Sequence, residues 1–526
     1  MTAVPFFFVE CSLTVSVVIN NLRANDNDYQ LRYDIEERVV MRGNRSWRLR
    51  GGAAVPAALV ALGMMVSSVD AAPADANADA NSNANDGALG FLTGISRSSS
   101  MLGDMWGMRP WLSKSGITFS LQETSEILGN VSGGSRQGFE YDGLTTATLQ
   151  MDTERAFGWH GGTANVSALQ IHGRNLSADN LSSLQTASGI EGDRATRLWE
   201  AWYQQKFLDE DRLDIRIGQQ SLDQEFMVSQ NALYFVNTMF GWPMVPSADM
   251  PGGGPAYPLS TPGLRLRAKA TDSVTMLAGV FNGAPAPATN TDSQKANGNG
   301  LKFPVDGSVL AIAELQYAYP NLNTLVQANE TEPLSRTYKI GAWYDSKKFS
   351  DQQIDDSGKS LADPNSTGIP KKHQGDYALY GVADQMVWRD FNEPDRTVNV
   401  FLRAMGTPDE DRNLVDFSLN AGLTVHEPFL NRDDDTFGLG MGLAHVGSHA
   451  SALDRDQSTY NGGFYPVRRS ETFVEATYQY AVTPWWQLQP DVQYIFNPGA
   501  GLQDPNDASK KIANETIVGI RTNILF

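Results

Sequence analysis

The strongest constraint on this chain is the two-residue alternation of apolar and polar side chains in its last strand. One face of residues 515–526 is apolar and is formed by Val518, Ile520, Thr522, Ile524 and Phe526. The opposite face is dominated by Glu515, Gly519, Arg521 and Asn523. Because successive side chains of a strand point to opposite sides, this segment separates an apolar surface from a polar one. An amphipathic strand that ends the chain on Phe526 is typical of a bacterial outer-membrane barrel, and an ordinary half-buried strand is the alternative.

The same alternation recurs in segments 485–496, 415–425, 264–270 and 212–217. Strands of about 10 residues with this period, separated by turn residues, are the sequence pattern of a transmembrane barrel. A soluble β-sandwich also alternates, but it does not usually place charged and amide side chains so uniformly on one face. The sequence therefore predicts an all-β fold, a transmembrane antiparallel β-barrel.

The composition is consistent with a barrel that has a polar lumen. Mean hydropathy is −0.33, and no run reaches the roughly 18 apolar residues that a membrane helix needs. The formal net charge of −19 argues against nucleic acid as a partner, because nucleic-acid binding requires basic surfaces. Acidic surface loops explain this charge without a specific ligand.

A secretory signal begins inside the chain rather than at its first residue. Arginines follow Met41, then comes the apolar run 53–66, and small residues end at Ala71. This order predicts a signal peptide over 41–71 that is cleaved after Ala71. Residues 1–40 then form an upstream extension, which we interpret as a misassigned start codon; a genuine long leader is the alternative. The single cysteine, Cys11, lies in this extension, so the mature chain would form no disulfide.

The remainder divides into three parts. Residues 72–88 are rich in Ala, Asn and Asp and are expected to be a disordered spacer. Residues 89–115 are expected to form a short periplasmic helical segment under or in the barrel mouth. Residues 116–526 are expected to form the barrel without a long helix, with long external loops at 283–308 and 351–376.

Several landmarks along the chain resemble the carbohydrate-selective porin family. They are the residues at 133–134, 198–204, 212–219, 235–241, 257–263, 384–385, 401–413 and 484–499. The resemblance covers roughly residues 116–526 and implies a barrel of about 16 strands, with 18 as the alternative. It also implies passive diffusion of mono- or small oligosaccharides across the outer membrane. The expected partners are sugars, outer-membrane lipid and the barrel-assembly machinery, which would read Phe526; the chain does not decide between monomer and homotrimer.

A sugar channel needs hydrogen-bonding side chains and an aromatic face inside the lumen, with binding weak enough for release. By alternation, Glu200 and Trp202 share a face opposite Trp199, and Arg216 faces inward on the following strand. The full set of pore-lining candidates is Arg197, Glu200, Trp202, Arg212, Arg216, Arg265, Arg267, Arg403, Glu475, Gln487, Gln489, Asp491 and Arg521. The alternative for each is a water-facing wall residue, and a bulge would turn Trp202 toward lipid.

Enzyme and metal signals are weak. Hydrolase, zinc-protease and phosphate-binding motifs are absent, so we expect no catalytic residue, no cofactor and no metal. If one strand carried both His445 and His449, they would lie about 13 Å apart, too far to share one metal. The triplet 433–435 suggests either a cation site or a solvated loop. Two other functions stay open: an outer-membrane barrel enzyme and a secreted β-rich glycan-binding protein.

Overall fold

The computed structural model describes residues 99–289, 292–320, 333–429 and 432–526. All of these residues belong to one compact unit of the chain. The predicted extension 1–40, signal peptide 41–71 and spacer 72–88 lie outside the described residues, as does the beginning of the segment 89–115.

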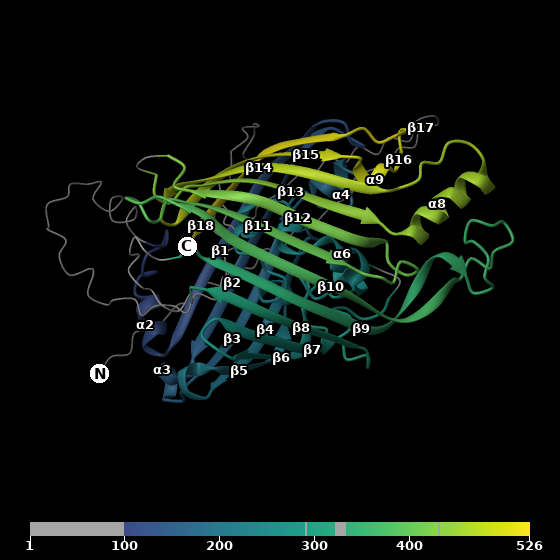
Figure 1. The fold of residues 1–526 in the computed structure, drawn as a ribbon. Coiled ribbons are helices and arrows are strands. Elements are labelled where there is room, and N and C mark those ends of the chain that lie inside the picture. The colour runs from purple at the N-terminus through teal and green to yellow at the C-terminus, as the bar shows by residue number, and fades with distance from the viewer. Residues whose placement is uncertain (1–98, 290–291, 321–332, 430–431) are drawn as a thin grey trace, which may run out of the picture. The chain divides into compact units, whose positions relative to one another are not determined.

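Sixteen antiparallel strands close into a barrel, in which neighbours along the chain pair and β1 pairs with β18 (Figure 1). This confirms the predicted transmembrane β-barrel and its strand number. The barrel strands are β1 (Ile117–Ser132), β2 (Gly138–Asp152), β3 (Gly162–Gly173), β4 (Ala195–Phe207), β5 (Leu213–Gln220), β6 (Thr261–Lys269), β7 (Val274–Asn282), β8 (Val309–Tyr319), β9 (Arg336–Asp355), β10 (Pro370–Arg389), β11 (Thr397–Gly406), β12 (Val415–His426), β13 (Thr436–Val446), β14 (Ser470–Thr483), β15 (Trp486–Phe496) and β18 (Glu515–Leu525). Two further strands, β16 (Gln503–Asp504) and β17 (Asp507–Lys511), form a separate hairpin.

The strand alternation separates a polar interior from an apolar outer surface. On β15, Val492 and Phe496 are exposed on the outside, whereas Gln489 and Asp491 are buried inside. Gln489 pairs in register with Arg521 of β18, so the polar residues of neighbouring strands meet on the same face. An exposed apolar outer band is what a lipid bilayer requires of a barrel.

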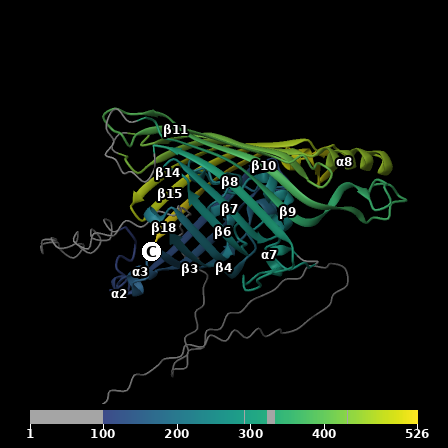
Figure 2. The same ribbon diagram turned by 60° about the horizontal axis from the view of Figure 1, so that its bottom comes forward.

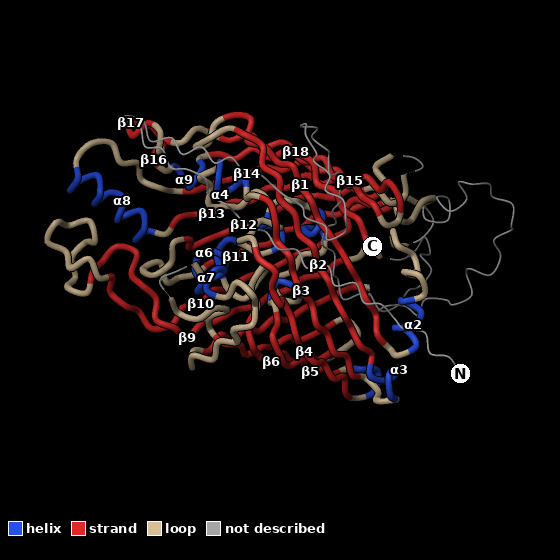
Figure 3. The backbone as a smooth tube through the Cα atoms, turned by 180° about the vertical axis from the view of Figure 1, so that it is seen from behind, coloured by secondary structure: helices blue, strands red, loops and turns tan. Residues whose placement is uncertain are grey.

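Most of the helices are short and lie in the connections between strands, whereas α2 precedes β1 (Figure 3). The α-helices are α2 (Met108–Lys114), α3 (Thr153–Phe157), α4 (Leu176–Asn180), α5 (Thr238–Gly241), α6 (Met244–Asp249), α7 (Ser293–Ala296), α8 (Ser448–Asn461) and α9 (Pro498–Gly501). The 3-10 helices are η1 (Asp209–Asp211), η2 (Leu222–Gln224), η3 (Asn231–Tyr234) and η4 (Pro251–Gly253). Among the described residues, no helix is both long and apolar enough to cross a membrane.

Two expectations about the connections need correction. The segment 351–376 is not one continuous loop, because residues 351–355 and 370–376 continue β9 and β10 as a paired hairpin beyond their other neighbours, and residues 356–369 connect them (Figure 2). The 14-residue helix α8 was not expected. Its sequence is mainly polar and small residues, so it lacks the apolar stripe by which a surface helix is usually recognised.

The helical segment predicted at 89–115 is represented by α2. It lies at the barrel end that carries the C-terminus (Figure 1). Arg109 of α2 donates a hydrogen bond to the backbone carbonyl of Phe526, and the amide of Met101 donates to the carbonyl of Leu525 at 2.6 Å. The segment is thus fixed to the last strand.

Candidate functional site

Two long connections fold into the barrel and fill part of its lumen. We call residues 174–194, between β3 and β4, the first inner segment, and residues 221–260, between β5 and β6, the second inner segment. The amides of Leu184 and Gln185 in the first segment donate to Glu471 of β14, both at 2.8 Å. The amides of Val236 and Asn237 in the second segment donate to Glu475 of β14 at 2.6 and 3.0 Å. Buried wall carboxylates thus hold the backbone of both inner segments.

A single arginine anchors the end of a short helix in the second inner segment. Arg403 of β11 is 1% exposed, and its guanidinium donates to the carbonyls of Met227, Met239, Phe240 and Gly241. The distance is 2.9 Å to the Met227 carbonyl and 3.0 Å to those of Phe240 and Gly241. The last carbonyls of a helix have no partner within the helix. The planar guanidinium satisfies several of them at once with its five fixed N–H donors, whereas a lysine ammonium offers only three.

Glycines in the wall make room for the aromatic side chains of this segment. Phe235 and Phe240 pack on β13, where a Cβ on Gly440 would lie 2.6 Å from the ring of Phe240 and 2.8 Å from that of Phe235. Phe401 and Phe473 of the wall complete the cluster, with Phe240 to Phe473 ring centroids 5.3 Å apart. The alternating glycines 438, 440 and 442 of β13 therefore serve close packing against aromatic rings.

A charged cluster surrounds Trp202 on the inner face of β4 to β6. The guanidinium of Arg216 lies 3.8 Å from the ring centroid of Trp202 and pairs with Glu225 of the second inner segment at 2.9 Å. Glu200 accepts from Trp202 Nε1 at 3.1 Å and from the amide of Ser221 at 2.9 Å. Arg265 also pairs with Glu225 and with Asp214. Opposite charges therefore compensate one another throughout this part of the wall.

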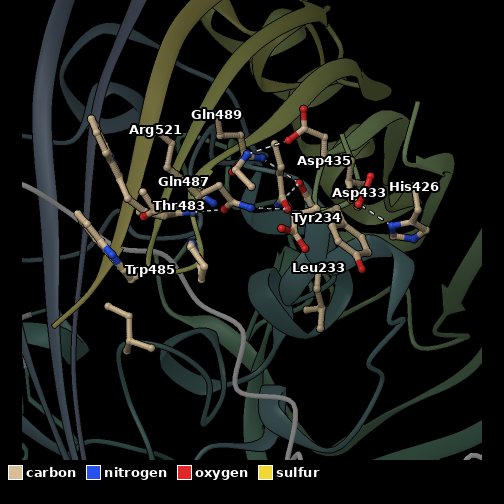
Figure 4. A pocket seen from close by; sticks show the side chains of 18 residues that line it. Leu233, Tyr234, His426, Asp433, Asp435, Thr483, Trp485, Gln487, Gln489 and Arg521 are labelled. Carbon is tan, nitrogen blue, oxygen red and sulfur yellow. Dashed lines mark hydrogen bonds between the residues drawn. The ribbon is translucent and has the colours of Figure 1, made fainter. Parts of the chain in front are cut away.

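A chamber of about 630 Å³ lies between the second inner segment and strands β14, β15 and β18 (Figure 4). Its wall carries four amide side chains, which we call the amide ladder: Gln479, Gln487, Gln489 and Asn523. Gln487 accepts from Asn523 at 2.8 Å and donates to Gln479 at 3.1 Å, and Gln489 donates to the carbonyl of Tyr234 at 2.9 Å. The aromatic residues Tyr234, Trp485 and Trp486 also line the chamber, together with Arg521, His426 and Asp435.

Asp435 lines this chamber from the turn between β12 and β13. It is 1% exposed and accepts from Arg432 at 2.6 and 2.8 Å, from Tyr478 at 2.6 Å and from the amide of Ala481 at 2.9 Å. Burial alone would raise the pKa of Asp435, but these hydrogen bonds outweigh it and lower the pKa below its ordinary value. Asp433 and Asp434 are exposed, so only part of this triplet is the solvated loop that the sequence suggested.

Comparison with known proteins gives the family. Residues 136–526 match the family described as carbohydrate-selective porin, OprB family. The chain belongs to this family. Porin B of Pseudomonas aeruginosa is 25% identical over 455 residues, which cover 82% of this chain and 92% of that protein. A high-pH structure of Pseudomonas putida OprB, also 25% identical, has a TM-score of 0.71 and covers 82% of this chain and 99% of its own. The chain is thus a porin of the bacterial outer membrane.

The porin carries most of the predicted pore-lining side chains inside its barrel, but many of them hold the inner segments. Arg403 and Glu475 anchor the second segment as described above. Gln489 donates to its Tyr234 carbonyl, and Arg521 pairs with Glu126 and donates to Ser188 Oγ at 3.4 Å. Asp491 accepts from Gln493 at 2.9 Å, and Arg267 pairs with Asp214 at 2.8 Å. Whether any of these residues contacts a solute stays a prediction.

Two placements differ from the sequence-based expectation. Arg212 lies in the turn before β5, where it pairs with Glu210 at 2.7 Å and Asp272 at 3.1 Å, so it is not an inward strand residue. Trp199 was placed on the outer face, but it is 4% exposed and packs edge-on against Tyr257 of the second inner segment. The cause is a bulge, because the β3–β4 register shifts between Ser167/Glu200 and Ala168/Leu198.

That bulge also explains how Arg197 joins the same interior as Glu200. Arg197 is 1% exposed and donates to the carbonyl of Asp193 at 3.2 Å. Strict alternation would put residues 197 and 200 on opposite faces, and one extra residue restores them to the same face. Three residues of the chamber were not among those expected from the sequence: Gln479, Tyr234 and His426. Gln479 could have been predicted, because it lies four residues after Glu475 on β14 and two-residue alternation puts both on the same face.

Proposed function

We propose that this porin lets small sugars diffuse passively through the space that its inner segments leave open, and that sugars contact the amide ladder and aromatic rings of the chamber. The observation that supports this most directly is the composition of the chamber wall. Amide side chains offer both donors and acceptors without net charge, which suits the hydroxyl groups of a neutral sugar. Tyr234 and Trp485 offer apolar faces for its C–H surface.

The chamber has a suitable size for such a solute. Small-molecule sites typically have volumes of about 300–1,000 Å³, and the chamber, which is partly open to solvent, has a volume of about 630 Å³. It is bounded on one side by the second inner segment, which a solute must pass. The compensated charges around Trp202 form the other proposed contact region, with Glu200, Trp202 and Arg216 as its principal residues. This arrangement favours neutral solutes over ions, because no uncompensated charge of either sign is left to bind an ion strongly.

The orientation in the membrane follows from the connections. Outer-membrane barrels have short periplasmic turns and longer extracellular loops. We therefore place the end with α2, Phe526 and the β14–β15 turn in the periplasm, and the end with α8 and the β9–β10 hairpin outside. The chamber then lies on the periplasmic side, and the outward side chains such as Val492 and Ile520 face lipid. We expect no catalytic step, and assembly is expected to require the barrel-assembly machinery.

Planar-bilayer recording with sugars added in increasing concentration tests the chamber. A Gln479→Leu, Gln487→Leu double variant should weaken sugar block of the current by about fivefold or more, because each lost hydrogen bond is worth about 1 kcal/mol. Gln503→Leu, which removes an amide from β16 outside the barrel, should behave like wild type. Block that is equal in all three proteins would place the sugar contacts elsewhere, and the absence of any sugar-dependent block in wild type would contradict sugar passage.

A further inference from the structure

Two histidines and two aspartates converge at the loop-bearing end of the barrel, outside the lumen site. His373 lies between two carboxylates, with Nε2 at 2.9 Å from Asp351 and Nδ1 at 3.2 Å from Asp411. His449 Nδ1 lies 3.2 Å from the other carboxylate oxygen of Asp351. One ligand atom from each of Asp351, His373 and Asp411 can be chosen so that all three lie within 4.8 Å of one another.

The cluster joins parts of the chain that are distant in sequence. Asp351 belongs to β9 and His373 to β10, in the portion of the hairpin that extends beyond the pairing of β9 with β8 and of β10 with β11. Asp411 comes from the connection between β11 and β12, and His449 from the first turn of α8. In Figure 2, α8 lies near this extended hairpin.

Asp351 is held in place before any ligand binds. Its side chain is 2% exposed, and its Oδ1 accepts from the amides of Gln353 and Ile354, both at 2.8 Å. His373 is also largely enclosed, with 12% of its side chain exposed, whereas Asp411 is 30% exposed. The cluster is therefore rigid on the β9 side and accessible from the Asp411 side, which gives an ion an entry path.

The spacing suits a zinc-class ion. Zinc binds imidazole nitrogen and carboxylate oxygen at about 2.0–2.2 Å in tetrahedral geometry, so two of its ligand atoms lie about 3.3 Å apart. Nε2 of His373 lies 2.9 Å from Asp351, close to that value, whereas Asp411 lies 3.2 Å from the other ring nitrogen, Nδ1, so the partly exposed Asp411 side chain has to move toward Nε2 when an ion binds. Mixed imidazole and carboxylate ligands favour zinc and neighbouring transition metals over calcium or magnesium. A carboxylate ligand that is itself hydrogen-bonded is also typical of metal sites, and His449 supplies such a bond.

We propose that Asp351, His373 and Asp411 form a binding site for a divalent transition-metal ion of the zinc class, with His449 positioning Asp351. His373 contributes one nitrogen, and the two carboxylates approach the ion from β9 and from the β11–β12 connection. A bound ion links the hairpin, this connection and, through His449, helix α8. It therefore stiffens the loop-bearing end of the barrel.

Binding of Zn²⁺ and Co²⁺ to the purified full-length porin in detergent tests the site. We expect one saturable Zn²⁺ site per chain, and Co²⁺ should give visible absorption bands of a low-coordinate ion. His373→Ala and Asp411→Asn should abolish both signals. His449→Ala should weaken Zn²⁺ binding by about 10- to 100-fold, the usual effect of removing a residue that orients a metal ligand.

The matched control is His445→Ala. His445 of β13 also pairs with an aspartate, Asp416, at 2.6 Å, but it has no second carboxylate partner in the part of the chain that the structure describes. This variant should bind Zn²⁺ like wild type. Zn²⁺ should also slow hydrogen exchange in residues 346–355 and 370–376 of wild type and not of His373→Ala. Absence of saturable binding in wild type, or equal binding in His373→Ala, would overturn the proposal and leave His373 as a structural contact between two carboxylates.

Discussion

The guanidinium of Arg216 lies 3.8 Å from the ring centroid of Trp202 and is paired with Glu225 at 2.9 Å. The indole face is therefore partly covered by a charge that is itself neutralised. A sugar that stacks on Trp202 shares this ring with Arg216, so the two residues act together in any solute contact here.

Trp202→Ala should weaken sugar block of the single-channel current by about fivefold, because a stacked ring is worth about 1 kcal/mol. Glucose titration in planar bilayers measures this effect. Trp111→Ala, which removes an exposed indole of α2, is the control and should leave the block unchanged. Unchanged block in Trp202→Ala would remove this residue from the solute path.

Arg216→Ala should shift the porin toward cations, since it removes a positive charge and leaves Glu225 with fewer partners. Arg216→Lys should retain most of the wild-type selectivity, and Glu200→Gln should shift it in the opposite direction. Reversal potentials in a salt gradient measure these shifts. A reversal potential equal to wild type in both Arg216→Ala and Glu200→Gln would show that this cluster does not face the conducting path.

Arg403→Met should release the second inner segment while leaving the barrel closed. It removes charged hydrogen bonds to four backbone carbonyls, so the free energy of local opening should fall by about 3 kcal/mol or more. Hydrogen exchange of residues 227–241 should accelerate, and the conductance should rise. Arg403→Lys should be intermediate because an ammonium group has three N–H donors in place of the five of a guanidinium. Equal exchange in Arg403→Met and wild type would mean that the aromatic cluster alone holds this segment.

Acid should loosen the turn that carries Asp435. The folded pKa of Asp435 lies below the ordinary value of 3.8, so the ionised carboxylate stabilises the fold above that pH. The stabilisation is lost as the pH falls from 3.8 through the lower folded value. The amide of Ala481, which donates to Asp435, should then lose protection beyond the intrinsic pH dependence of exchange. Asp435→Asn should show low protection without this acid transition, whereas Asp433→Asn, at an exposed neighbour, should retain it.

Deletion of Phe526 should reduce the amount of folded, heat-modifiable porin in the outer membrane. Its amide donates to the carbonyl of Leu121 at 3.1 Å, and its own carbonyl accepts from Arg109. Electrophoresis of unheated membranes measures the folded fraction. Phe496→Ala, which removes an exposed aromatic residue from the outer face of β15, controls for the loss of one ring. Equal assembly of the truncated and complete chains would argue against a role for this residue in assembly.

Much of the wall could be predicted from the sequence. Alternation placed Gln487, Gln489 and Asp491 on the inner face of β15 and Arg521 on that of β18, because the side-chain period of a strand is a local property of two residues. Where a bulge adds one residue, the same rule fails, as at Trp199. The polar helix α8 was missed for a similar reason, since its sequence carries no apolar period.

The barrel, its closing strand and the polarity of each face could be predicted from the sequence, since these features follow from patterns repeated within single strands. Which loops enter the lumen depends instead on contacts between distant parts of the chain. The second inner segment is fixed by contacts such as Val236 to Glu475, which are 239 residues apart, and no local pattern encodes a partner at that distance. The amide ladder likewise depends on three strands meeting around one chamber. The barrel wall is therefore encoded by local sequence patterns. The path through the barrel is set by hydrogen bonds and packing between residues that are distant in sequence.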